Sequence, residues 1–198
     1  MKSANPKQSA WEESILKFVK KNNLVLLETG RSRNPNWKNS DGNSTDFFSN
    51  SNLVSKIYSI DNDSEQFSGF STSEKYCRSF LSPEALDKIT FLNGDSEIMI
   101  KNTNFAETLD VVLLDSANNG DVILKEFLAI LPKLSKNSLI IVDDVTHPAV
   151  KGVKIIHLLN SLNIPYETRE AHPCDCMYFF LDESTKEVIL KKVNILSD

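Results

Sequence analysis

Acidic residues close or follow a series of short apolar runs in this sequence. The runs are LVLLE, KIYSID, ITFLNGD, VVLLD and LIIVDD, and each places a carboxylate at or within three residues of the end of a stretch with the character of a buried strand. Carboxylates gathered in one place can accept hydrogen bonds from hydroxyl or ammonium groups, or bind a divalent cation. Taken singly, each can instead cap the helix that follows its strand. The residues concerned are Glu28, Asp61, Asp95, Asp115, Asp143 and Asp144.

The turn after the first run limits the choice of ligand. A dinucleotide pyrophosphate is usually held by the amides of a G-x-G-x-x-G turn that opens a helix. Here the glycine after Gly30 comes only at Gly42, so that fingerprint is missing. An edge lined with carboxylates and lacking this turn favours a cationic ligand, ribose hydroxyls or a divalent metal ion.

The order of apolar runs predicts the elements that position these acids. Ser9 and Glu12 form a capping box that predicts an opening helix, and apolar spacings of three and four predict helices between later runs. This alternation predicts an α/β fold: a doubly wound, mostly parallel, Rossmann-like sheet with helices on both faces. The carboxyl ends of its strands form the ligand-binding edge, where the acids are expected. The predicted parallel strands are Leu24–Glu28, Lys56–Ile60, Thr90–Leu92, Val111–Leu114 and Leu139–Val142.

The pattern changes beyond Pro165. The segments YETRE, CMYFFLD and KEVILKKV predict short strands without helices between them, and therefore an antiparallel C-terminal edge. We expect residues 1–198 to form a single domain, because a chain of this length can bury one sizeable core, and we expect residues 1–8 to be flexible.

Composition argues for small-molecule chemistry. The chain carries a net charge of -5, so it has no excess of basic residues for the phosphate backbone of a nucleic acid, and we expect no nucleic-acid partner. No N-terminal signal core and no apolar run of membrane-spanning length are present, so we expect a cytoplasmic protein without membrane contact. The cysteines, Cys77, Cys174 and Cys176, are expected to be reduced thiols. The sequence leaves the oligomeric state open, a homodimer included.

The ordered motifs resemble those of a known enzyme family. LLETG with GNST, IYSIDND, FLNGDS, LDVVLLDSANNGD and LIIVDDV, together spanning Leu24 to Val145, are similar to the motifs of class I S-adenosylmethionine-dependent methyltransferases. Within that class the chain is most similar to small bacterial members and to the metal-assisted catechol and caffeoyl-CoA type O-methyltransferases. The resemblance implies transfer of a methyl group from S-adenosylmethionine to a small-molecule acceptor, at oxygen.

The resemblance also implies where the methionine part of the cofactor would lie. It would be bordered by the turn from Glu28 to Gly30 and by the segment formed by Gly42, Asn43 and Ser44. The first motif departs from the family pattern here, because its two glycines are normally only a few residues apart and the insertion RSRNPNWKNSD separates them.

Three further strand ends would contact the rest of the cofactor by the same resemblance. Asp61 would accept hydrogen bonds from the ribose hydroxyls, and Asp95 with Ser96 would lie beside the adenine. Asp115 would face the ammonium group of the cofactor or the acceptor molecule.

The chemistry of an O-methyltransferase adds a base or a metal to these contacts. Asp115, Asp143 and Asp144 resemble the Asp, Asp and Asn metal ligands of the metal-assisted branch, with Asp144 in place of Asn, and three carboxylates suit Mg²⁺. Each of these acids is equally explained by capping. His147 follows the acidic pair and, like Asp115, is a candidate catalytic residue, because histidine can act as a general base near neutral pH.

Other functions stay open at this point. A non-catalytic cofactor-binding protein could use the same scaffold, since a fold does not fix a function. A nucleotide-sugar enzyme could use the acidic DND segment at Asp61, and an NAD-dependent enzyme would share the sheet but would be expected to carry the missing glycine fingerprint.

Overall fold

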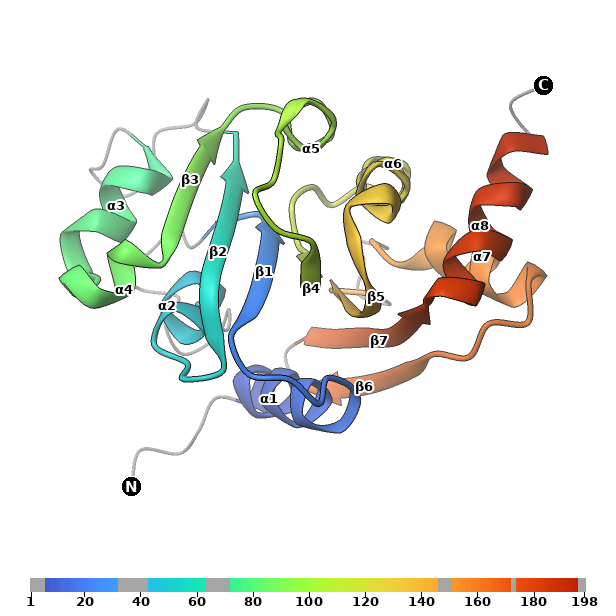
Figure 1. The fold of residues 1–198 in the computed structure, drawn as a ribbon, viewed down its shortest axis with the longest axis horizontal. Helices are drawn as coiled ribbons and strands as arrows, with labels where there is room; N and C mark the ends of the chain where they lie inside the picture. Colours follow the sequence, from blue (N-terminus) through green and yellow to red (C-terminus); the bar gives the residue numbers. More distant parts are fainter. Residues whose placement is uncertain (1–5, 32–42, 63–71, 146–150, 172–173, 196–198) are drawn as a thin grey trace.

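A mostly parallel sheet organises the molecule. The computed structural model describes residues 6–31, 43–62, 72–145, 151–171 and 174–195. In these residues the sheet has seven strands in the order β3-β2-β1-β4-β5-β7-β6 (Figure 1). The first five strands in the chain pair in parallel, whereas β7 is antiparallel to β5 and to β6, as the sequence predicted. The strands are β1 Leu24–Thr29, β2 Val54–Asp61, β3 Ile89–Asn93, β4 Leu109–Leu114, β5 Leu134–Asp143, β6 Glu167–Ala171 and β7 Cys174–Asp182.

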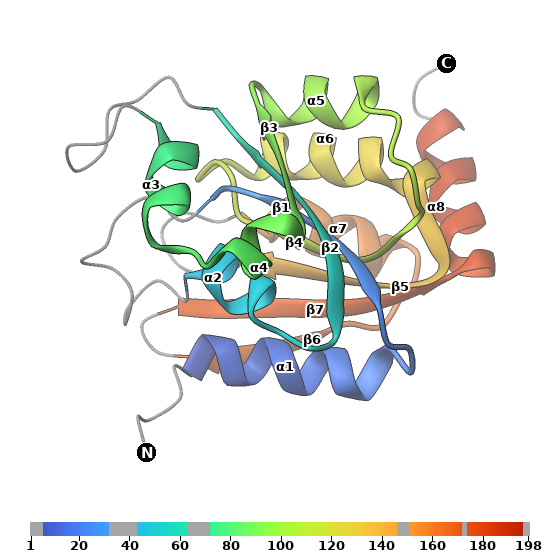
Figure 2. The same cartoon turned by 60° about the vertical axis from the view of Figure 1, so that its left-hand side comes forward.

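Helices cover both faces of this sheet. Figures 1 and 2 show α5 and α6 on one face and α1 on the other, where α1 contacts β5, β6 and β7. Among the described helices, none combines the length and the apolar character that a membrane span requires. The helices are α1 Pro6–Phe18, α2 Ser44–Ser49, α3 Ser73–Phe80, α4 Pro83–Asp87, α5 Ser96–Asn102, α6 Gly120–Ile130, α7 Val153–Ser161 and α8 Glu183–Ile195, with a short 3-10 turn at Leu131–Lys133.

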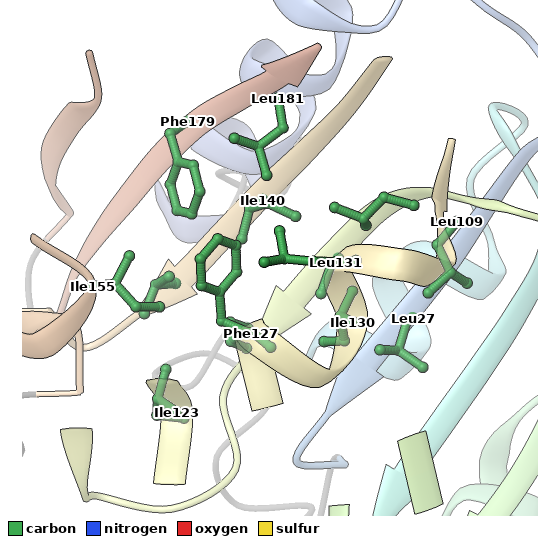
Figure 3. Packing of buried hydrophobic residues seen from close by; sticks show 14 of the residues in the cluster. Leu27, Leu109, Ile123, Phe127, Ile130, Leu131, Ile140, Ile155, Phe179 and Leu181 are labelled. Atoms are coloured by element: carbon green, nitrogen blue, oxygen red, sulfur yellow. The ribbon is translucent and has the colours of Figure 1, made fainter. Parts of the chain in front are cut away.

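The apolar runs form strands because both faces of the sheet are covered. Successive side chains of a strand point to opposite faces, and in β4 Val112 belongs to one buried cluster and Val111 to the other. In the cluster that contains Val112, Phe127 of α6 packs edge to face on Phe179 of β7, with 5.4 Å between ring centroids. Figure 3 shows Ile140 of β5 beside these two rings. A continuous apolar run is therefore the expected pattern for these central strands.

The strand register aligns the carboxyl ends that carry the acids. Thr29 of β1 lies opposite Ile60 of β2 and opposite Leu114 of β4. Leu114 in turn lies opposite Val142 of β5. Residues that follow these positions therefore emerge at one edge of the sheet, which is the edge where ligands bind in this kind of fold.

The opening helix begins earlier than the sequence predicted. Helix α1 starts at Pro6, so Ser9 lies inside the helix and does not cap it. Proline favours the first turn of a helix because its fixed φ is already helical and its missing N–H has no helical partner there. Residues 6–8, which we expected to be flexible, are helical, and Lys7 is buried.

The last predicted strand is wrong, because KEVILKKV lies in helix α8. The carboxylate of Asp182 accepts a hydrogen bond from the amide of Thr185 at 2.8 Å, which satisfies a free amide of the first helical turn. Lys191 pairs with Glu187 one turn away, and Ile189 is buried against the sheet. The capping aspartate and the charge spacing were the helix signals; the apolar run alone fits either structure.

Candidate functional site

The predicted site residues that the structure describes lie at the expected edge. Asp61 is the last residue of β2 and Asp143 the last of β5, while Asp115 directly follows β4. Gly42 and His147 lie outside the described residues. The edge therefore brings together acids from strands that are distant in sequence, and their individual environments decide what each can do.

Gly30 allows the loops after β1 and β4 to touch. Its backbone has a φ of 84°, and its amide donates to the carbonyl of Ile60 at 3.0 Å. A Cβ at this position would lie 2.2 Å from the carbonyl oxygen of Asp115, closer than real atoms approach. The amide of Asp115 also donates to the carbonyl of Thr29 at 2.9 Å. This contact lies between β1 and β4, where the strand order reverses and ligands bind in such sheets.

Glu28 anchors the far end of the insertion in the first motif. Its buried carboxylate accepts hydrogen bonds from Ser44 Oγ at 2.9 Å, Thr45 Oγ1 at 2.7 Å and Ser59 Oγ at 2.5 Å. Burial raises the pKa of Glu28 even though these three hydroxyls act to lower it. The hydroxyls of Ser44 and Thr45 hold the start of α2 against β1, and that of Ser59 links the carboxylate to β2. The segment that follows Gly42 therefore lies beside Glu28, although the insertion separates it from Gly30 in the sequence.

Arg31 links the loop after β1 to the ends of β2 and β3. Its buried guanidinium donates to the carbonyl of Ser59 at 2.7 Å, to the carbonyl of Leu92 at 3.0 Å and to Ser73 Oγ at 3.1 Å. The guanidinium also lies 4.9 Å from the ring centroid of Phe91. These contacts tie the first residues after β1 to the ends of β2 and β3 and to α3, which gives the arginine a structural role.

Glu126 is a site residue that sequence reasoning missed. It lies on α6 and is fully buried, and its carboxylate accepts hydrogen bonds from Thr29 Oγ1 at 2.9 Å, from Ser116 Oγ at 2.5 Å and from Ser96 Oγ. These hydroxyls come from the ends of β1 and β4 and from the start of α5. Burial raises the pKa of Glu126 against the lowering effect of the hydroxyls. The signal in the sequence was a glutamate three residues after Ile123, on the core-facing side of an amphipathic helix.

Two of the predicted acids differ in their local roles. The carboxylate of Asp95 accepts a hydrogen bond from the amide of Ile98 at 3.0 Å and caps α5, as the capping alternative proposed. Asp61 is almost fully buried, and its carbonyl accepts a hydrogen bond from the amide of Gly94 at 2.9 Å. This bond places the turn before α5 beside the end of β2, which is where the ribose and adenine contacts were predicted.

Asp115, Asp143 and Asp144 form the acidic cluster, with carboxylate oxygens within 4.8 Å of one another. Two lysines reach into it. Lys7 of α1 lies 2.6 Å from Asp143 Oδ2 and 3.7 Å from Asp144 Oδ1. Lys151, which precedes α7, lies 2.5 Å from Asp115 Oδ1 and 3.2 Å from Asp144 Oδ2. Every carboxylate of the cluster is therefore paired with at least one ammonium group.

The electrostatics of the acidic cluster follow from this pairing. Burial and the neighbouring Asp143 raise the pKa of Asp115 to about 7, although Lys151 and Lys7 act to lower it. Burial alone would lower the pKa of each lysine, but the carboxylates raise both, so the lysines keep their charge at neutral pH. Asp115 is thus a carboxyl group that can change its protonation state near neutral pH.

The cluster as described does not fit an additional divalent cation. A magnesium ion needs several open oxygen ligands and retains bound waters. Here Lys7 and Lys151 already occupy hydrogen-bonding positions on all three carboxylates, and a dication would lie close to both ammonium groups. The magnesium site stays a prediction, and no chemical step is assigned to a metal.

The comparisons with known proteins agree with this fold. A family model described as a methyltransferase domain matches residues 40–145, which is more than half of the chain. No curated protein matches the sequence.

The solved structures that share this fold include the following three, each of which covers most of this chain. The precorrin-6y C5,15-methyltransferase of Geobacter metallireducens is 15% identical, with a TM-score of 0.60 and coverage of 92% of this chain and 93% of its own. A Staphylococcus aureus protein described as a caffeoyl-CoA O-methyltransferase is 13% identical, with a TM-score of 0.60 and coverage of 87% and 82%. An rRNA methylase of Streptococcus thermophilus is 11% identical, with a TM-score of 0.59 and coverage of 92% and 100%. At these identities the structural matches speak for the fold alone.

Proposed function

Because the chain belongs to the methyltransferase domain family, as a class I enzyme that depends on S-adenosylmethionine, we propose that it methylates an oxygen atom of a small acceptor molecule. The observation that carries the proposal is the environment of Asp115. Its side chain is 21% exposed, stands beside Gly30 where the strand order reverses, and has a pKa raised to about 7.

The reaction makes two demands on the protein. Methyl transfer from a sulfonium is a direct displacement, which a protein accelerates largely by aligning the nucleophile with the methyl group. A hydroxyl acceptor must also lose its proton, and a base serves best when its pKa lies near the working pH. We assign this proton transfer to Asp115, with His147 as the second candidate for the base. An acceptor that is already nucleophilic, such as a thiol anion, would not need it.

Cofactor binding is assigned to the same edge. S-adenosylmethionine would supply the electrophilic methyl group when bound. Glu28 and Gly30, with Gly42, Asn43 and Ser44, would border its methionine part. The carboxylate of Asp61 would accept hydrogen bonds from the ribose hydroxyls. An edge rich in carboxylates suits a ligand that carries a sulfonium and an ammonium group.

The small size of the acceptor is inferred from charge. The structural neighbours include an rRNA methylase as well as methyltransferases named for small molecules, so the fold permits either kind of acceptor. This chain carries a net charge of -5, and the acidic cluster lies at the carboxyl edge of the sheet, where the reaction is proposed to occur. Phosphate-rich acceptors would be repelled there, which favours a small hydroxylated molecule.

The proposal is tested by following a labelled methyl group. The protein is incubated with methyl-labelled S-adenosylmethionine and separate acceptor panels that carry phenols, aliphatic hydroxyls, amines, thiols or ribosomal RNA. We expect label in an oxygen-linked product, at a rate that rises as the pH increases through about 7, because the base must be unprotonated. Label that enters only RNA, nitrogen, sulfur or carbon would overturn the assignment to oxygen of a small molecule.

A further inference from the structure

Two buried lysines enter the acidic cluster from separate parts of the chain. The side chain of Lys7 is 1% exposed and that of Lys151 is 4% exposed, and lysines are almost never so buried unless they are paired. Lys7 comes from the first turn of α1, which Figure 2 shows at the same edge as the start of β7. Lys151 comes from the residues just before α7. Lys7 is 136 positions from Asp143 in the sequence, whereas Lys151 follows Asp144 by seven.

The two lysines supply the same positive charge to the cluster as a divalent metal ion would. Three carboxylates held within 4.8 Å of one another repel strongly in a buried setting. A divalent cation would add two positive charges to them, and the two ammonium groups add the same two charges. In both cases one negative charge is left over. The ammonium groups also donate directed hydrogen bonds, with Lys7 on Asp143 and Lys151 on Asp115 and Asp144.

We propose that Lys7 and Lys151 together take the place of a divalent cation at the Asp115, Asp143 and Asp144 cluster, so that this cluster holds no metal ion. Lys151 is then a positioning residue, since it fixes the carboxylate of Asp115 from which the proposed function starts. Only this last clause rests on the proposed function, because the pairing itself is a property of the cluster.

Another buried lysine provides a matched control. Lys186 of α8 donates to the carbonyl of Ser135 at 2.8 Å and pairs with Glu183 at 2.8 Å. It is nearly as buried as Lys151, but its ammonium group is held largely by backbone carbonyls and lies outside the acidic cluster. Replacing Lys186 removes a buried positive charge without exposing the cluster to an ion.

The experiment measures the melting temperature without cofactor, in EDTA and in about 5 mM MgCl₂ at matched ionic strength. For the wild type we expect a difference below about 1 °C, because no site is open to the ion. Lys151→Met should melt about 6 °C or more below the wild type in EDTA, because a buried pair is broken. Magnesium should then raise its melting temperature by about 3 °C or more, because the ion restores the lost charge. Lys186→Met should be destabilised without this recovery.

The wild type is also titrated with MgCl₂ by calorimetry, which needs no variant to fold. Saturable binding or clear stabilisation of the wild type by magnesium would overturn the proposal. It would equally be overturned if Lys151→Met folded and gained no response to magnesium, or if Lys186→Met gained the same response. None of these readouts uses cofactor or acceptor. A failure to find methyl transfer to oxygen would therefore leave the lysine proposal standing, and a failure of the lysine proposal would leave the proposed methyl transfer standing.

Discussion

Gly30→Ala is expected to lower the free energy of unfolding by about 2 to 5 kcal/mol and to weaken binding of S-adenosylhomocysteine about tenfold or more. Alanine pays about 1 to 2 kcal/mol for the left-handed backbone that Gly30 adopts with a φ of 84°. Its Cβ would also overlap the carbonyl of Asp115, and relieving that overlap by a backbone shift costs about 1 to 3 kcal/mol more. Urea unfolding gives the stability and calorimetry gives the affinity.

Gly94→Ala separates backbone strain from the overlap. Gly94 also has a positive φ, of 146°, but a Cβ there would meet only the side chain of Met99, at 3.3 Å from its sulfur. Methionine side chains adapt easily, so we expect the backbone cost without the loss of contact between the loops after β1 and β4. Equal losses of affinity in the two variants would mean that the contact of Gly30 with Asp115 does not shape the cofactor site.

Glu126→Ala is expected to destabilise the protein by about 2 to 4 kcal/mol and to lower cofactor affinity. The substitution leaves a cavity between α6 and the sheet. It also removes the carboxylate that accepts hydrogen bonds from the hydroxyls of Thr29, Ser96 and Ser116. Each hydroxyl bond contributes about 1 kcal/mol, and removal of a desolvated carboxylate offsets part of the total. The loops that border the predicted cofactor site would lose their common anchor, so the loss of affinity should accompany the loss of stability.

Glu126→Gln supplies the control and a test of charge. Burial raises the pKa of Glu126 above its ordinary value of 4.5. A raised pKa in the folded state means that the stability contributed by this group is present below pH 4.5 and is lost as the pH rises through the folded pKa. Glutamine keeps the shape but does not titrate. The wild type should therefore lose stability relative to Glu126→Gln as the pH is raised from about 4.5, and a constant difference between the two would contradict the assignment.

The elements that carry the acids could be predicted because their signals are local. A strand covered on both faces is a continuous apolar run, and the acid that ends it follows directly in the sequence, as Asp61 follows Ile60. Helix α8 was missed for a local reason too, since a short apolar run fits a strand or a helix and the deciding cap at Asp182 was overlooked.

The partners of the acids could not be predicted because their contacts are distant in sequence. Lys7 and Asp143 are separated by 136 positions, and a lysine in a polar N-terminal segment looks like a solvent-exposed residue until the fold buries it. The three carboxylates of Asp115, Asp143 and Asp144 do lie close together, but their ion pairs with Lys7 and Lys151 could not be predicted. Glu126 is intermediate, because its position among buried residues of α6 was readable while its hydroxyl partners were not.

The most direct test of the central claim, that S-adenosylmethionine binds along the carboxyl edge of this sheet, is calorimetric titration of Asp61→Ala with S-adenosylhomocysteine. We expect saturable binding to the wild type, weakened in the variant by about 1.5 to 3 kcal/mol, or about 10- to 150-fold, the range for hydrogen bonds to a charged group. Asp121→Ala, which removes an exposed acid of α6, should bind as the wild type does. An Asp61→Ala affinity equal to that of the wild type would remove Asp61 from the site and contradict the placement of the cofactor.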